Sequence, residues 1–223
     1  MKIAIVIGTR PEIIKVAPIL LLSRKSTRNI FQFIHSGQHY DYEMSLQFID
    51  ELHLPNPDVY IKVYDRSPTG QMSEFISKIS VALRDLSPDM LLVQGDTNTT
   101  LAATIAANKL GIPVGHIEAG LRSYDWRMPE EYNRRLTDHL STFLFAPTDH
   151  AKQNLLRENV MGHIYVTGNT IVDAVLHFYP IAVKRSGILS EIPFEEYALF
   201  TAHRAENVDN SWILENFVGF ILE

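Results

Sequence analysis

The sequence has 223 residues, 46% hydrophobic and 21% charged, a composition typical of a globular protein with room for one sizeable domain and part of another. It contains no cysteine, which excludes disulfides, thiol catalysis and zinc–thiolate sites. A net charge of −6 argues against a general nucleic-acid binder, and no apolar run is long enough for a membrane span or a signal peptide, so we expect a cytoplasmic protein.

Short apolar runs rich in strand-forming residues alternate with longer amphipathic segments. Continuous apolar strands separated by helices are typical of a parallel sheet covered on both faces. We therefore predict a Rossmann-like α/β fold, a doubly wound parallel sheet. The predicted strands are 2–7, 30–35, 59–64, 90–94, 114–117, 143–146 and 164–167. The predicted helices are 12–25, 43–51, 71–86, 99–110, 130–141 and 149–158.

The remaining sequence predicts a helix that leads out of this domain, a linker, one more strand at 197–201 and one more helix at 211–222. A single β-α unit cannot bury a core by itself, so we expect it to pack on something else or to begin an incomplete second domain. The predicted division is a first domain at 1–168, a connecting helix and linker at 169–193, and the start of a second domain at 194–223.

Ligands of open parallel sheets bind at the carboxyl ends of the strands, and the first such loop is GTRPEIIK. Arg10 and Lys15 lie near the start of a helix, where they could meet a diphosphate or could simply be surface residues. The loop is neither GxGxxG nor a Walker loop, which disfavours nicotinamide cofactors and ATP.

Two later strands end in carboxylates. Asp96 follows the fourth strand in QGDTNTT, where it is either a helix cap or a general acid or base. Glu118 ends the fifth strand in HIEAGLRS and is followed by Arg122. Because a polar group beside a buried strand is costly unless paired, Glu118 is the stronger functional candidate of the two.

A third carboxylate and a histidine complete the candidate site. Glu130 opens a helix in MPEEYNRRLTDH, where it is either a solvated helix start or a functional group, and His203 follows an apolar run in TAHR. Two such carboxylates could transfer protons on opposite faces of one carbon. No close-spaced metal-ligand motif and no serine nucleophile elbow is present, which disfavours metal and serine hydrolase chemistry.

Seven motifs together resemble the non-hydrolysing UDP-N-acetylglucosamine 2-epimerases. They occur in order from Gly8 to Asn207, nearly the whole chain, and are GTRPEIIKVAPI, SGQHYD, VQGDTNTTLAAT, HIEAGLRS, MPEEYNRRLTDHLS, VTGNTIVDAV and TAHRAEN.

The resemblance implies a two-domain, glycosyltransferase-B-like architecture, here with the second domain truncated. It implies interconversion of UDP-N-acetylglucosamine and UDP-N-acetylmannosamine by removal of the C2 proton, elimination of UDP and its re-addition, without a metal or redox cofactor. It also implies a UDP-sugar as the binding partner and a homodimer, with no nucleic acid or membrane. By resemblance, the catalytic residues are Asp96, Glu118, Glu130 and His203, and the substrate-binding residues are Arg10, Lys15 and Arg122.

Two alternatives stay open at this point. A hydrolysing relative would release UDP and free N-acetylmannosamine, although the proline-containing GTRPE loop favours the non-hydrolysing branch. A non-catalytic module would bind a sugar nucleotide weakly or pair with another chain, and an exposed apolar surface near 217–222 would support it. Since half of the cleft is expected to be missing, we expect an N-terminal fragment with little activity of its own.

Overall fold

The computed structural model describes residues 1–37, 42–65, 67–201 and 209–222. These residues form two compact units, Met1–Ala182 and Val183–Glu223, which are described separately. In the described ranges, no helix combines the length and the apolar character that crossing a bilayer requires.

The first unit is built on a seven-stranded sheet in the order β3-β2-β1-β4-β5-β6-β7. Every neighbouring pair is parallel, which confirms the predicted doubly wound α/β class. The strands are β1 (Lys2–Ile7), β2 (Ile30–His35), β3 (Val59–Tyr60), β4 (Met90–Gln94), β5 (Val114–Ile117), β6 (Phe143–Ala146) and β7 (His163–Val166).

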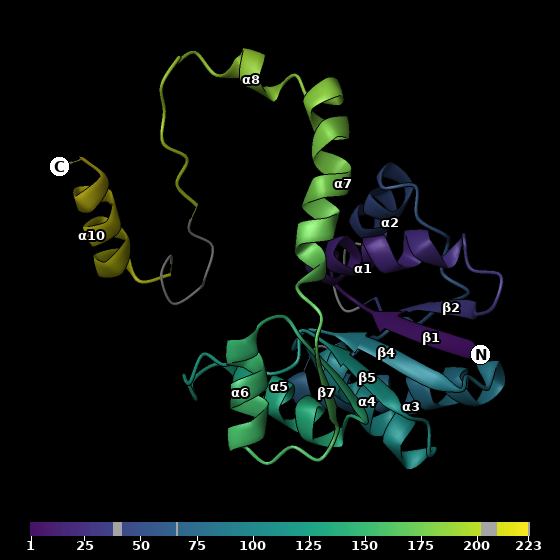
Figure 1. Ribbon diagram of the computed structural model, residues 1–223. Coiled ribbons are helices and arrows are strands. Elements are labelled where there is room, and N and C mark those ends of the chain that lie inside the picture. The colour runs from purple at the N-terminus through teal and green to yellow at the C-terminus, as the bar shows by residue number, and fades with distance from the viewer. Residues whose placement is uncertain (38–41, 66, 202–208, 223) are drawn as a thin grey trace. The chain divides into compact units, whose positions relative to one another are not determined.

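Helices cover both faces of this sheet. Figure 1 shows α3, α4, α5 and α6 on one face and α1, α2 and α7 on the other. The first face buries side chains of α3 and α4 against β1 and β4, and the second buries α1 against the same strands. The bounds are α1 (Arg10–Ser23), α2 (Tyr42–Glu51), α3 (Pro68–Leu86), α4 (Asn98–Lys109), α5 (Pro129–Leu140), α6 (Asp149–Arg157) and α7 (Thr170–Arg185).

The strand order changes direction between β1 and β4. From β1 the chain winds outward to β2 and β3, then returns to β4 and winds the other way to β7. The helices that follow β1 and β4 therefore lie on opposite faces of the sheet, and in open α/β sheets ligands bind at the carboxyl ends of the strands at such a point. The candidate site residues are predicted from the sequence to lie at this edge.

Three predicted elements differ from the structure. Strand β3 is an edge strand that ends at Tyr60, because its ladder with β2 stops at His35. The predicted strand at 197–201 is wrong: this stretch has no regular structure and Leu199 is exposed, because a strand needs a neighbour to satisfy its N–H and C=O groups. The predicted linker contains a short helix, α8 (Ile188–Glu191).

The second unit also contains α10 (Ser211–Leu222), as predicted. Several large apolar side chains of α10 are exposed, which fits the expectation that this segment buries no core of its own. The division of the chain at 168 and 193 stays a prediction.

Candidate active site

Asp96 lies in the turn after β4. Gly95 has a φ of +76°, which turns the chain away from the strand and which glycine adopts without a steric penalty. The helix cap is Thr97 rather than Asp96, because the Thr97 hydroxyl accepts a hydrogen bond from the Thr100 N–H at 3.2 Å. The Asp96 carboxylate instead pairs with Arg134 of α5, and its side chain keeps 34% of its surface exposed.

Glu118 lies at the tip of the adjacent strand β5 and is almost fully buried. One carboxylate oxygen accepts hydrogen bonds from the Lys15 ammonium, at 2.7 Å, and from the Gln94 amide. The other accepts from Asn169 Nδ2 at 2.7 Å. Its φ is +70°, a strained conformation for a residue with a side chain, of the kind that clusters at functional sites.

The first loop supplies Lys15 to this site, one full turn and more into α1. The Arg10 guanidinium lies 5.5 Å from the centre of the Phe48 ring of α2, within the range of a cation–π contact. The structure therefore brings Lys15, Asp96 and Glu118 to the carboxyl ends of three neighbouring strands and places Arg10 at the start of the same helix.

Glu12 is a buried residue of this loop that the sequence reasoning missed. It accepts hydrogen bonds from the N–H groups of Gly8 and Thr9 and from the hydroxyls of Thr97 and Thr100. Burial raises the pKa of its carboxyl, although the hydrogen bonds from Thr97, Gly8 and Thr9 oppose that change. The sequence signal for Glu12 is the capping box that it forms with Thr9, a Thr followed three residues later by Glu at a helix start.

The paired glutamates at the start of α5 have different environments. Glu130 is exposed, and no hydrogen bond or ion pair joins its side chain to another described residue. Glu131 is buried and accepts hydrogen bonds from the N–H and hydroxyl of Ser123 at 3.0 Å. Burial opposes its ionisation, but the Ser123 hydrogen bonds and the pairs with Arg135 and Arg134 outweigh it, and its pKa is lowered.

The Arg122 guanidinium forms ion pairs with two carboxylates of the protein and is not exposed to solvent. Its side chain is buried, and its guanidinium contacts Asp138 at 2.8 Å and Glu158 at 2.7 Å. A further guanidinium hydrogen bond goes to the Leu121 carbonyl. This geometry favours a role in fixing the loop after β5, and direct contact between Arg122 and substrate stays a prediction.

His203 lies outside the described residues, and its role stays a prediction. Within the described ranges, no three His, Cys, Asp or Glu side chains are grouped as metal ligands would be.

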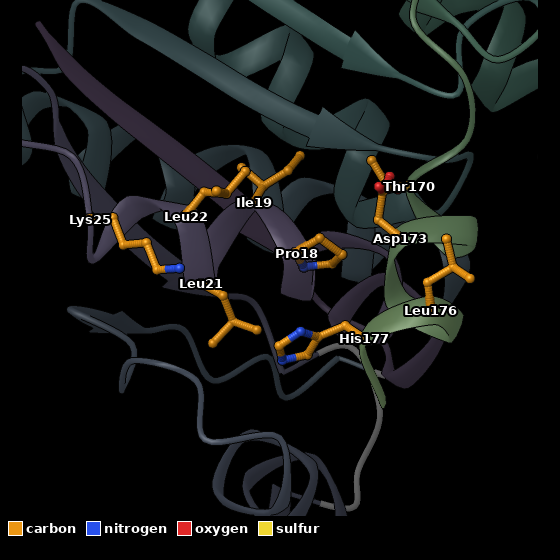
Figure 2. A pocket seen from close by; sticks show the side chains of 9 residues that line it. All are labelled: Pro18, Ile19, Leu21, Leu22, Lys25, Thr170, Asp173, Leu176 and His177. Carbon is orange, nitrogen blue, oxygen red and sulfur yellow. The ribbon is translucent and has the colours of Figure 1, made fainter. Parts of the chain in front are cut away.

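A pocket also lies between α1 and α7 (Figure 2), and it contains none of the predicted site residues. It encloses about 510 Å³ and is lined largely by apolar side chains such as Leu22 and Leu176, with Lys25, Asp173 and His177 at its walls.

Fold and site together define a class of protein: a doubly wound α/β domain that holds carboxylates, a lysine and arginines at the carboxyl edge of its sheet. Residues 23–223 match the family described as UDP-N-acetylglucosamine 2-epimerase. The chain belongs to the UDP-N-acetylglucosamine 2-epimerase family, which confirms the resemblance carried by the seven motifs.

Two relatives and one solved structure illustrate the match. The chain is 47% identical, over its whole length, to the UDP-N-acetylglucosamine 2-epimerase of Methanocaldococcus jannaschii, and it spans 62% of that protein. It is 37% identical to the UDP-2,3-diacetamido-2,3-dideoxy-D-glucuronate 2-epimerase of Pseudomonas aeruginosa and spans 63% of it. A crystal structure of the M. jannaschii enzyme in complex with UDP-GlcNAc and UDP superposes on the whole chain with a TM-score of 0.90, at 47% identity and 62% coverage of that enzyme.

Proposed function

We propose that the protein carrying this chain is a non-hydrolysing UDP-N-acetylglucosamine 2-epimerase, an isomerase. The observation that carries the proposal is the placement of Asp96 and Glu118 at the tips of adjacent strands, with Lys15 bound to Glu118. The reaction removes the C2 proton, breaks the C1–oxygen bond so that UDP leaves with the bond electrons, and forms a 2-acetamidoglucal. UDP then adds back at C1 while a proton enters C2 on the opposite face.

The environments of the three carboxylates suggest a division of labour. Three donors satisfy both oxygens of the buried Glu118, whereas Asp96 pairs with Arg134 but stays partly exposed, and Glu130 is exposed. Asp96 and Glu130 are therefore the better candidates for the acid and the base at C2, and Glu118 holds Lys15 in place. His203 and Arg10 are assigned to the charge that develops on the departing UDP.

The experiment is exchange of the C2 proton of UDP-N-acetylglucosamine with deuterated water. It is measured on this chain alone and on this chain joined to the remaining residues of the M. jannaschii relative. Exchange in the joined chain, lost in Asp96→Asn and Glu130→Gln, supports the proposal. A joined chain that binds UDP without exchange would instead be a non-catalytic module, and release of free sugar would identify a hydrolysing enzyme.

The relatives differ in the sugar that their names give, since the P. aeruginosa protein is named for a diacetamido glucuronate. The substituents of the sugar that this protein binds are therefore a separate question. Comparing UDP-N-acetylglucosamine with that uronate in the same assay decides between them, and faster exchange of the uronate would contradict the proposed substrate. The homodimer and the cytoplasmic location stay predictions.

A further inference from the structure

His116 is a buried residue of β5 that bridges two other parts of the fold. Its Nε2 lies 2.7 Å from the carbonyl oxygen of Gly95, in the turn after β4. Its Nδ1 lies 2.7 Å from Oδ1 of Asp138, in the last turn of α5. The side chains of His116 and Asp138 are both fully buried. The ring is therefore held by the Gly95 carbonyl and the Asp138 carboxylate.

These two partners fix the protons of the ring. A backbone carbonyl only accepts hydrogen bonds, so Nε2 must donate. In a neutral imidazole this leaves Nδ1 with a lone pair, which would face a carboxylate oxygen at 2.7 Å and be repelled by it. A proton therefore lies between His116 and Asp138.

The contacts of the second carboxylate oxygen of Asp138 indicate which of the two groups carries that proton. It lies 2.8 Å from Arg122 Nη2 and accepts a hydrogen bond from the Gly120 N–H at 3.2 Å. Because the guanidinium is permanently charged, both contacts favour the ionised carboxylate. The proton then belongs to the ring, and the pair is an imidazolium bound to a carboxylate.

The remaining surroundings of the ring are apolar or already paired. The residues beside His116 on the neighbouring strands are Val93 and Leu144. The Arg122 behind Asp138 is bound on its other side by Glu158. Among the described residues, Asp138 is the ionisable group that contacts the ring, and a positive ring completes an alternating row of charges from Glu158 through Arg122 and Asp138 to His116.

We propose that His116 is a positioning residue, a buried imidazolium that ties the turn after β4 to α5 and to the loop after β5. Asp96 directly follows Gly95, and Glu118 lies two residues after His116, so one ring sets the spacing between these two carboxylates. The Gly95 N–H also donates to the Ile117 carbonyl at 3.1 Å, which strengthens the same link. The catalytic consequence rests on the proposed function, whereas the protonation state does not.

The test is nuclear magnetic resonance of this chain labelled with ¹⁵N-histidine, at neutral pH and without substrate. His116 is assigned by the signal lost in His116→Asn. The expected result is a ring with both nitrogens protonated. In Asp138→Asn, the ring should become neutral and keep only its Nε2 proton, because the asparagine amide can donate to Nδ1. His163→Asn, at an exposed histidine, is the matched control.

Positioning is read from the backbone amide signals of Asp96 and Gly120 in a second, uniformly ¹⁵N-labelled sample. Both should shift in His116→Asn and Asp138→Asn and stay in place in His163→Asn. In the exchange assay, His116→Asn should lower kcat about 100-fold with KM little changed, as expected when reacting groups are displaced by about 1 Å.

Two results would overturn the proposal. A His116 ring with one protonated nitrogen in the unmodified chain contradicts the imidazolium, and unmoved Asp96 and Gly120 amides in the folded variants contradict the positioning role. If His116→Asn does not fold, Asp138→Asn alone still decides both points. Absence of C2 exchange in both the unmodified chain and the joined chain would refute the proposed function. The spectra would still test the protonation of His116 and its effect on the positions of Asp96 and Gly120.

Discussion

The Lys15 ammonium lies 2.7 Å from the Glu118 carboxylate, although 103 residues separate the two along the chain. The lysine side chain is 28% exposed and the glutamate side chain 5%, so the pair lies at the border between the core and the surface. It joins the helix after β1 to the tip of β5 across β4.

Replacing Lys15 by Met should destabilise the fold by about 1–2 kcal/mol. The change leaves a buried carboxylate without its cation, but Gln94 and Asn169 still donate to it, which keeps the loss below that of an isolated charge. Urea unfolding of the 223-residue chain measures the effect. Lys25→Met, at an exposed lysine just beyond the same helix, is the control, and equal losses in both variants would contradict the role of the ion pair.

The neighbouring glutamates of α5 should separate catalysis from stability. Glu130→Gln should leave the free energy of unfolding within about 0.5 kcal/mol and lower C2 proton exchange roughly 10²–10⁴-fold, the range for loss of a general acid or base. Glu131→Gln breaks buried pairs with Arg135 and Arg134 and should cost about 3 kcal/mol. A stable, inactive Glu131→Gln together with an active Glu130→Gln would reverse the assignment.

Gly120 should tolerate no side chain. It has a φ of +82°, and a Cβ built on it would lie 2.3 Å from the Ala151 carbonyl oxygen. Gly120→Ala therefore combines left-handed strain with overpacking against backbone and should cost about 3–5 kcal/mol. Gly111→Ala is the matched control, since φ is +71° there with no atom within 4 Å, and only the strain of about 1–2 kcal/mol should appear. Equal unfolding free energies for the two variants would count against the clash.

The chain should lose stability in mild acid through His35. This residue is fully buried against Tyr60, and burial lowers its pKa from 6.5 to about 4. Between those values the unfolded chain binds a proton that the folded chain does not, so the free energy of unfolding falls as pH falls through this window, by up to about 3 kcal/mol. Above pH 6.5 this contribution is complete.

Urea unfolding at steps from pH 7.5 to pH 4.5 measures this loss. His35→Gln removes the titrating ring, so the variant should show a shallower decline than the unmodified chain. His163→Gln, at an exposed histidine, should leave the slope unchanged. Parallel pH profiles for the unmodified chain and His35→Gln would contradict the prediction.

The fold could be predicted because its signals are local. Apolar runs such as KIAIVI are buried on both faces of the sheet, and their lengths set the strand bounds to within a residue at most positions. The strand predicted at 197–201 is absent for a physical reason. An apolar sequence favours an extended backbone, but a strand also needs a neighbouring strand as its hydrogen-bond partner, and a short stretch of sequence does not show whether one is present.

The site could be predicted only in part. The rule that ligands bind at strand ends located Asp96 and Glu118, but the partners of each side chain come from distant segments. Helix α5 shows why: it buries Glu131 and Asp138 while Tyr132 and Leu136 are half-exposed. Hydrophobicity alone would predict that Tyr132 and Leu136 are buried and that the two acids are exposed. The arginines that pair with the buried acids come close to them only in the folded chain.

The positive φ of Glu118 has a consequence for selection on this sequence. Glycine relieves the backbone strain there, and asparagine and aspartate adopt this conformation more readily than glutamate. The glutamate side chain, however, accepts hydrogen bonds from Lys15, Gln94 and Asn169 at once, so the contacts that hold Lys15 in the site also offset the strain at the tip of β5. A library of variants at position 118 screened for thermal stability should therefore keep glutamate in the unmodified chain, and should move towards glycine or asparagine once Lys15 is replaced by Met.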